Sequence, residues 1–251
     1  MPNPQAAAVL VFRGQASGAE PPIRIIQGPK TGLVYPHSVN VDRQNNEIVV
    51  GDPGGRSIMI FPREANGDVP PSRVIQGSKT KIGYMVGVAI DPVHNLIFVG
   101  SGSYQQVGIL IFKRTDSGDV APLGIIAGPM TGIEGVPWQI QTYPEKGSVF
   151  VAVANIDYDR LYRLDKPVDG LPLNPELPSP WRSSDKGFIG VWKATDTGNV
   201  APKAVIKGPI SGLVYPAGLA LNTRDGELIV SDSVRNGILT YLVPDFFRDM
   251  K

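Results

Sequence analysis

The stretch Gly198–Asn222, GNVAPKAVIKGPISGLVYPAGLALN, decides the fold because it recurs in recognisable form along the chain. Four copies, separated by 49, 51 and 80 residues, start at Gly18, Gly67, Gly118 and Gly198. A second glycine follows ten residues after each start, at Gly28, Gly77, Gly128 and Gly208. Self-similarity with a period of about 50 residues predicts a repeat architecture, in which each copy builds one supersecondary unit.

The copy from Pro70 to Val120 has the composition of a four-stranded antiparallel sheet. Short runs of β-branched and aromatic residues alternate with Gly, Pro, Asn and Asp, which is typical of strands joined by tight turns. The run Ile109–Phe112 has no polar face, so it must be covered on both sides. A sheet packed between two copies of itself meets this requirement, and the sequence therefore predicts the blades of a β-propeller. A solenoid of stacked hairpins is the alternative.

A sequence pattern within this copy resembles a known repeat. Its parts are Gly87-Val-Ala-Ile-Asp91, Leu96-Ile-Phe-Val99, Gly108-Ile-Leu-Ile-Phe112, Gly118-Asp-Val-Ala-Pro122 and Ile125-Ile-Ala-Gly128. The pattern resembles the NHL-type propeller repeat and, more loosely, the YVTN type, over nearly the whole chain except Ala154–Lys186. The resemblance implies an all-β propeller of four-stranded antiparallel blades. It implies little about function, because one fold hosts many activities.

The number of blades follows from counting strands, which we name a to d outward from the propeller axis. The c strand occurs five times and the a and b strands four times, so we predict four blades plus one surplus strand. We expect the N-terminal c and d strands, Val9–Phe12 and Ile23–Gln27, to close the ring onto the last c strand, Gly237–Leu242. Five blades, with residues 159–165 building part of another blade, and a ring completed by a second chain are the alternatives.

Composition limits the classes of protein and of partner. The 251 residues, 42% of them hydrophobic, are enough to bury the core of one propeller domain, 1–251, with an inserted loop at 154–186. A net charge of +1 argues against nucleic acid or a charged membrane as partner. The absence of cysteine excludes disulfides, thiolate metal sites and a cysteine nucleophile. We expect a soluble protein, cytoplasmic or exported with its signal peptide absent from this chain.

The loops on one face of the propeller are the candidates for function. Because strand direction alternates, the b–c and d–a loops share one face and the a–b and c–d loops share the other. The c–d loops 65–68, 116–119 and 196–199 are alike in sequence, which favours a structural role, whereas the b–c loops differ. The predicted partner-binding residues in the b–c loops, four of them in the insert, are Tyr104, Asp157, Tyr158, Arg160 and Trp181. A proline-rich lid packed on the propeller is the alternative role of the insert.

Two further residues belong to the same predicted site. Trp138 occupies the first position of an a strand, where other copies have Ser38, Gly87 and Gly218, so it lies near the mouth of the channel. It either fills the space left by three small residues or stacks on a ligand. His37 lies at the mouth of another a strand.

No metal site or catalytic residue is predicted. The second histidine, His94, falls in an a–b turn on the face opposite His37, so the two should not share a metal. Propellers similar to gluconolactonases hold a divalent cation with carboxylates and Asn. The axial positions here are mostly apolar or small, whereas Asp42, Asp91 and Asn222 align at the far end of strand a and suit the a–b turn.

We therefore predict a non-catalytic scaffold that uses no cofactor and binds a protein or small ligand through the variable loops. A metal-dependent hydrolase or lactonase is the alternative. We also expect a positive φ at most of the second glycines, because a recurring glycine suggests a conformation that a Cβ disfavours.

Overall fold

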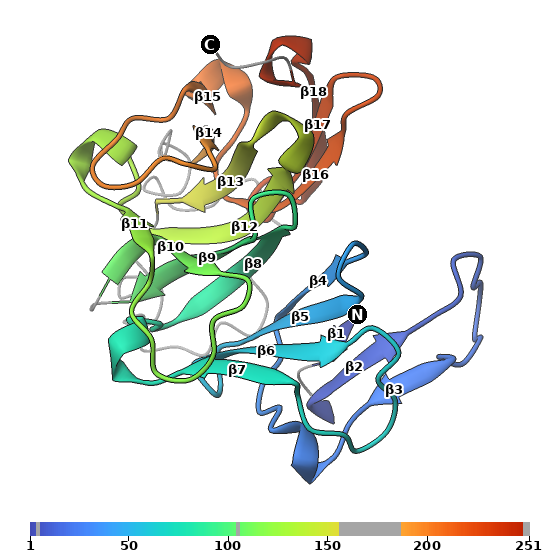
Figure 1. The fold of residues 1–251 in the computed structure, drawn as a ribbon. Helices are drawn as coiled ribbons and strands as arrows, with labels where there is room; N and C mark the ends of the chain where they lie inside the picture. Colours follow the sequence, from blue (N-terminus) through green and yellow to red (C-terminus); the bar gives the residue numbers. More distant parts are fainter. Residues whose placement is uncertain (4–5, 104–105, 156–186, 248–251) are drawn as a thin grey trace, which may run out of the picture. The chain divides into compact units, whose positions relative to one another are not determined.

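The described chain folds into five antiparallel sheets that follow one another in sequence order (Figure 1). The computed structural model describes residues 1–3, 6–103, 106–155 and 187–247. The regular elements in these ranges are strands and short 3-10 helices. The predicted all-β fold with four-stranded antiparallel blades is therefore confirmed, and the number of blades is five.

Three sheets are complete, with four strands each. The first comprises β4 (Ser38–Asp42), β5 (Glu47–Asp52), β6 (Ser57–Pro62) and β7 (Arg73–Gln76). The second comprises β8 (Met85–Asp91), β9 (Leu96–Ser103), β10 (Gln106–Lys113) and β11 (Gly124–Ile126). The third comprises β12 (Val136–Tyr143), β13 (Ser148–Ala154), β14 (Phe188–Lys193) and β15 (Ala204–Lys207). In each sheet every strand pairs with its neighbours in sequence, so the expected order from a to d is confirmed.

Two further sheets have three strands each. The N-terminal sheet contains β1 (Pro2–Asn3), β2 (Ala8–Val11) and β3 (Arg24–Ile26). The C-terminal sheet contains β16 (Pro216–Asn222), β17 (Glu227–Asp232) and β18 (Gly237–Leu242). The prediction of four blades was wrong because the N-terminal c and d strands, β2 and β3, form a sheet of their own with β1. The surplus c strand is thus the middle strand of a fifth sheet that lacks full a and b strands.

The expected closure of the ring by an N-terminal outer strand stays a prediction. β18 pairs with β17, whereas β2 pairs with β1 and β3. At the inner edge of β2, Pro2 pairs with Val9 and the Leu10 N–H donates to the Met1 carbonyl oxygen at 2.7 Å.

Short 3-10 helices mark the connections between strands. One follows each d strand, and these are η2 (Pro29–Thr31), η3 (Ser78–Thr80), η4 (Pro129–Thr131) and η6 (Pro209–Ser211). A further one, η5 (Pro144–Lys146), lies in the a–b turn of the third complete sheet. After β18, η7 (Pro244–Phe247) brings the Phe247 ring to 5.4 Å from that of Phe150, in a stacked arrangement.

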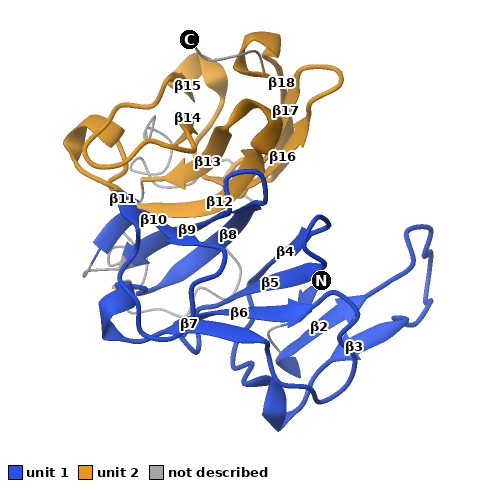
Figure 2. Cartoon of the chain, viewed as in Figure 1, with its two compact units in different colours: residues 1–125 blue, residues 126–251 orange. Residues whose placement is uncertain are grey.

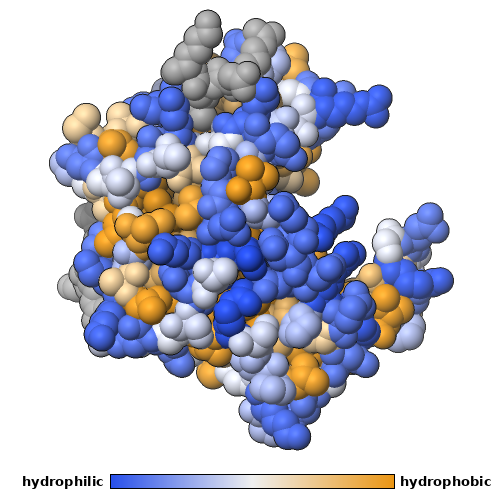
Figure 3. Space-filling view, viewed as in Figure 1, coloured by the Kyte–Doolittle hydropathy of each residue, from blue (hydrophilic) through white to orange (hydrophobic). Residues whose placement is uncertain are grey.

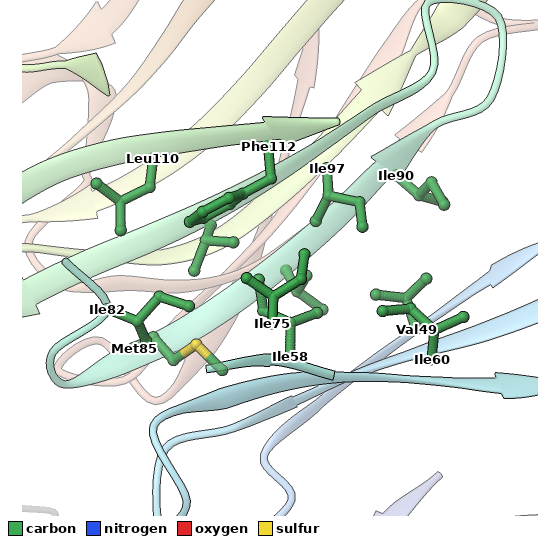
Figure 4. Close-up of a cluster of buried hydrophobic side chains, with 12 residues drawn as sticks. Val49, Ile58, Ile60, Ile75, Ile82, Met85, Ile90, Ile97, Leu110 and Phe112 are labelled. Atoms are coloured by element: carbon green, nitrogen blue, oxygen red, sulfur yellow. The ribbon is translucent and has the colours of Figure 1, made fainter. Parts of the chain in front are cut away.

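The chain divides into two compact units, residues 1–125 and 126–251 (Figure 2). Within the first unit, Ile58 and Ile75 from one complete sheet face Leu110 and Phe112 from the next, and all four are fully buried (Figure 4). The whole run Ile109–Phe112 is at most 4% exposed, which confirms the cover expected on both sides of that strand. A single domain spanning residues 1–251 stays a prediction.

Consecutive sheets within a unit are joined by a contact that we call the glycine latch. Ile75 at the end of β7 forms a parallel bridge with Gly118 in the next c–d loop. The Lys79 N–H donates to the Asp119 Oδ1 at 2.7 Å. Gly77 has φ 132°, and a Cβ added there would overlap the Asp119 side chain. The turn therefore requires glycine, both for its backbone conformation and for the close approach of the carboxylate.

The glycine latch recurs along the chain. Lys30 N–H donates to Asp68 at 2.7 Å in the first unit, and Met130 N–H donates to Asn199 at 2.8 Å in the second. The positive φ expected at the second glycines is confirmed at all four, with values of 130°, 132°, 117° and 90° at Gly28, Gly77, Gly128 and Gly208. The structural role predicted for the c–d loops is confirmed by these hydrogen bonds, because the loops supply the Asp and Asn acceptors.

Candidate binding face

The d–a and b–c loops meet at one end of their sheets, as the sequence predicts. In the first unit the N–H groups of Val34 and Tyr35 donate to the carboxylate of Asp52, at 2.6 and 2.9 Å. In the second unit the N–H groups of Val214 and Tyr215 both donate to Asp232, at 2.8 Å. Each aspartate ends a b strand, and each pair of donors lies in the d–a loop ahead of the same sheet. In each unit the two loop types therefore form a surface, which we call the loop face of that unit.

The buried aspartates hold this surface together. Asp52 also accepts from Gly55 N–H at 2.9 Å, and Asp232 also accepts from Val234 and Arg235 N–H groups. Both carboxylates are at most 1% exposed. A buried carboxylate that accepts several backbone N–H bonds fixes the loops around it and has few lone pairs left for a metal. In the described ranges, no three His, Asp or Glu side chains are grouped so as to hold a metal ion.

Exposed aromatic side chains lie on the loop face of the first unit. Tyr35 in the loop before β4 is 47% exposed, and Tyr84 in the loop before β8 is 42% exposed. The two tyrosines hold corresponding places, because each lies seven residues after the second glycine of its repeat, Gly28 or Gly77. Val34, beside Tyr35, is 58% exposed. These residues were not predicted from the sequence, although the recurring Leu-Val-Tyr-Pro of residues 33–36 and 213–216 indicates a tyrosine at a fixed place in the loop.

His37, a predicted site residue, lies next to these side chains. The His37 ring lies 6.4 Å from the ring of Tyr35, and the residue is half-buried. The main-chain N–H of His37 donates to the Gly51 carbonyl oxygen at 2.9 Å. The neighbouring b–c turn packs closely, since a Cβ added at Gly54 would lie 2.7 Å from the Cβ of Tyr35. The position predicted for His37 at the loop face is thus confirmed, while its role in binding stays a prediction.

Trp138 occupies a β-bulge on the loop face of the second unit. The pairing of β12 with β13 shifts between Pro137 and Gln139, and that of β16 with β17 shifts in the same way between Pro216 and Gly218. Trp138 therefore corresponds to Ala217, and the predicted correspondence with Gly218 was wrong by one residue. A bulge redirects the side chain that it carries. The Trp138 ring is half-buried and lies 5.5 Å from the ring of Tyr215.

The other predicted site residues lie outside the described ranges. They are Tyr104, Asp157, Tyr158, Arg160 and Trp181. The structure does place the start of the insert that contains four of them, because β13 ends at Ala154 and β14 begins at Phe188. Asn155 accepts from the N–H groups of Glu134 and Gly135 at 2.9 and 3.0 Å, so the insert leaves from the loop face.

The opposite end of the sheets carries the turn residues that the sequence predicts. Asp91 accepts from the His94 N–H at 2.9 Å, and its second oxygen lies 2.7 Å from the His94 Nδ1. Asp42 accepts from the N–H groups of Gln44 and Asn45, both at 2.9 Å. The Asn222 amide donates to acidic side chains in its own turn. The a–b turn role is therefore confirmed for all three aligned residues, and His94 lies away from the loop face.

Comparisons with known proteins bear on the fold alone. No protein-family model and no curated protein matches the sequence. Among solved structures, the chain is similar to one in a nidogen–laminin complex, with 14% identity, TM-score 0.48 and coverage of 82% of this chain and 60% of the other. It is also similar to hydrazine synthase of Kuenenia stuttgartiensis, with 8% identity, TM-score 0.51 and coverage of 83% and 46%. The chain thus spans less than two thirds of either protein.

The second of these likenesses indicates a fold of the β-propeller type, in agreement with the five sheets. No helix among the described residues has the length and apolar character needed to cross a membrane.

Proposed function

We propose that this chain is a non-catalytic propeller of the NHL-like kind that binds a protein or small-ligand partner through its loop face. The observation that carries the proposal is the pair of exposed tyrosines, Tyr35 and Tyr84, at corresponding places on neighbouring sheets. Tyrosine is enriched among residues that dominate interfaces, because it offers a large apolar ring with a polar end. Loops on a rigid scaffold are the usual location of binding residues.

The loops that carry these tyrosines are held in place before any partner binds. Asp52 fixes the main chain at Tyr35, and the Tyr84 carbonyl oxygen accepts from the Gly102 N–H at 2.9 Å. A surface that is already ordered loses less conformational entropy on binding, which favours affinity. The net charge of +1 supports a partner recognised by apolar and hydrogen-bonding contacts rather than by a long-range field.

The insert belongs to the proposed binding surface. It leaves from Asn155, whose side chain is tied to the d–a loop, and it carries Asp157, Tyr158, Arg160 and Trp181. Aromatic and arginine side chains are the types that most often anchor interfaces. Tyr104, in another b–c loop, is included for the same reason. The lactonase alternative is not proposed, because the buried carboxylates of Asp52 and Asp232 already accept backbone hydrogen bonds.

Replacement of Tyr35 and Tyr84 by alanine tests the proposal. The immobilised chain and the double variant are exposed to the same cell extract, and the proteins retained by each are quantified by mass spectrometry. Loss of two anchors of about 2 kcal/mol each predicts that specifically retained partners fall by at least tenfold. The matched control, Val93→Ala, removes an exposed side chain from an a–b turn and should change nothing. Equal retention by the double variant would contradict the proposal.

A second test addresses the insert. Residues 156–186 are replaced by Gly-Asn, which joins Asn155 to Gly187 through a tight turn. The sheet β12–β15 should keep its circular dichroism and melting temperature, because its strands do not include the replaced residues. Partner retention should be lost. Binding that survives this replacement, or a chain that unfolds, would show that the insert is structural.

A further inference from the structure

Two cations on the loop face of the first unit have a backbone conformation that their residue types disfavour. Arg56 in the b–c turn has φ 49°, and Lys81 in the d–a loop has φ 58°. The other described non-glycine residues with a positive φ are Ala7 and three asparagines, and asparagine tolerates this left-handed region better than most residues. At Arg56 and Lys81 a long charged side chain therefore occupies a position that reduces the stability of the fold.

The corresponding positions of the other repeats carry residues that fit this conformation with less strain. Lys81 follows the 3-10 helix η3, and each equivalent helix of the other repeats is followed by a glycine with φ between 70° and 76°. These glycines are Gly32, Gly132 and Gly212. The last b–c turn has Asn236, with φ 50°, at the place of Arg56. Turn formation alone therefore does not explain the two cations, and strained residues in exposed loops favour a role in binding.

The turn that carries Arg56 is fixed between two loops of the same face. Asp52 accepts from Gly55 N–H and from Tyr35 N–H, at 2.9 Å each, which ties the turn to the loop before β4. The Gln76 side-chain amide, at the end of β7, donates to the Gly55 carbonyl oxygen at 2.8 Å, which ties the turn to the loop before β8. These contacts lie within the first unit, so the two cations share one surface with the two tyrosines.

The two cations have no acidic partner in these loops. No Asp or Glu occurs in the d–a and b–c loops of the first unit, which are residues 27–37, 53–56, 77–84 and 104–105. Arg56 and Lys81 are both exposed, and neither forms an ion pair with a described residue. The loop face of the first unit therefore presents positive charge beside Tyr35 and Tyr84. In the view of Figure 3 the first unit likewise presents hydrophilic residues with smaller hydrophobic patches among them.

The positive charge is limited to these two side chains. Lys30 and Lys79 lie in the same d–a loops, but their main-chain N–H groups donate to the latch carboxylates of Asp68 and Asp119, both at 2.7 Å, and these carboxylates offset their charge. A nucleic acid is bound by a row of cations that contact several phosphates. Two cations beside aromatic rings instead suit a peptide that carries a few carboxylates. Screening confines their field to about 10 Å, so the small net charge of the chain does not oppose such binding.

We propose that the partner of this surface is an acidic peptide segment, whose Asp or Glu carboxylates bind Arg56 and Lys81 and whose apolar side chains pack on Tyr35 and Tyr84. This inference rests on the function proposed above and names the chemistry of the partner. The Arg56 guanidinium can hold a carboxylate through two parallel hydrogen bonds, and the Lys81 ammonium adds a point charge. The tyrosine rings supply apolar area next to these charges.

Selection of random dodecapeptides on the immobilised whole chain tests the charge of the partner. Peptides that bind the wild-type chain but not the double variant Tyr35→Ala with Tyr84→Ala should be enriched in Asp and Glu. Tyrosine-dependent peptides that are neutral or basic would overturn this inference and leave the proposed function standing. The absence of any tyrosine-dependent peptide would overturn both.

Reversal of both charges tests the assignment to Arg56 and Lys81. The variant Arg56→Glu with Lys81→Glu places two carboxylates beside the tyrosines, so its affinity for a selected acidic peptide should fall by about tenfold or more. The same selection on this variant should enrich Lys and Arg instead of Asp and Glu, while circular dichroism checks the fold. Enrichment of acidic peptides by the reversed variant would contradict the assignment.

Two milder variants separate binding from folding. Arg56→Asn and Lys81→Gly introduce the residues that other repeats have at these positions, so the melting temperature should not fall. The affinity for a selected acidic peptide should nevertheless fall by about fivefold or more in each variant. The matched control, Arg43→Asn, removes an exposed cation from an a–b turn at the opposite end of the sheet and should leave the affinity unchanged. Unchanged affinity in both loop-face variants, or an equal loss in the control, would overturn the proposal.

Competition with RNA separates an acidic peptide from a nucleic acid as the partner. Unstructured poly-U RNA of matched length should fail to displace a labelled acidic peptide at concentrations at which the unlabelled peptide displaces it. Displacement by RNA at lower concentrations than the unlabelled peptide requires would identify a site for a polyanion and would rule out the acidic peptide as the proper partner.

Discussion

The turns after β7 and after β15 have the same design, yet only the first is latched. After β7, Gly77 contacts Asp119 and Ile75 is fully buried. After β15, Gly208 has φ 90° but nothing lies within 4 Å of an added Cβ, and Ile206, which corresponds to Ile75, is only half-buried. One turn sequence thus contributes differently to stability in two places, because the latch depends on a c–d loop from the following sheet. Repeats with similar sequences are not energetically equivalent.

The largest expected effect is a difference in stability between alanine substitutions at Gly77 and at Gly208. Gly77→Ala must adopt a backbone conformation that costs about 1–3 kcal/mol and must also displace the Asp119 side chain. Gly208→Ala meets only the backbone cost, since the space around it is open. Urea denaturation should therefore show Gly77→Ala to be less stable than Gly208→Ala by about 1 kcal/mol or more. Equal losses would contradict the latch as the source of the difference.

A smaller effect is expected when the carboxylate of the latch is removed. Asp119→Ala deletes the acceptor of the Lys79 N–H and should cost about 1–2 kcal/mol. Glu64→Ala is the control, because its ion pair with Arg24 is largely exposed. In combination with Gly77→Ala the loss should be less than additive, since Asp119→Ala also relieves the overlap with the new Cβ. Full additivity in a double-mutant cycle would show that the two residues do not interact.

The smallest expected effect is a pH dependence confined to the latched junction. There Glu47 lies 2.8 Å from Arg73 and 3.0 Å from Arg114, whereas Ala204 replaces the corresponding arginine in β15. Burial raises the pKa of Glu47, but hydrogen bonds and charge from the two arginines outweigh it and lower the pKa overall. A pKa that is lower in the folded chain than in the unfolded chain, where it is near 4.3, stabilises the fold at pH values above about 4.3. This contribution is lost as the pH falls through the pKa of the folded chain.

Glu47→Gln tests that dependence. The urea midpoint of the wild-type chain should fall between pH 6 and pH 3 more steeply than that of the variant, because the variant has no carboxylate to protonate. Glu64→Gln serves as the control for loss of an exposed acid. Parallel pH profiles for all three chains would show that Glu47 does not cause the pH dependence of stability.

The sequence predicted the parts of the fold that depend on local pattern. Strand positions, the a–b turns at Asp42, Asp91 and Asn222, and the positive φ at the recurring glycines follow from residue types at a fixed period. The number of blades did not follow, because it depends on whether the N-terminal c and d strands form a sheet of their own. The decisive contact is the pairing of Pro2 and Asn3 in front of β2, a two-residue strand with no sequence signal.

The candidate site was predicted less completely than the fold. The loop face was found because alternation of strand direction fixes which loops share an end. Tyr35 and Tyr84 were missed because exposure depends on how the loop folds over its aspartate, which no periodicity reports. Trp138 was aligned with Gly218 instead of Ala217, because a β-bulge shifts the register of the strand pairing without changing the residue pattern.

Hydrogen exchange at the loop before β4 tests most directly the central claim that the tyrosines are presented by a preformed loop. The amides of Val34 and Tyr35 donate to the buried carboxylate of Asp52, so they should exchange at least tenfold more slowly than the amide of Arg43, an exposed residue in the a–b turn. Asp52→Ala should abolish this protection while the amides of β6 remain protected. Exchange at Val34 and Tyr35 as fast as at Arg43 in the unmodified chain would contradict the account.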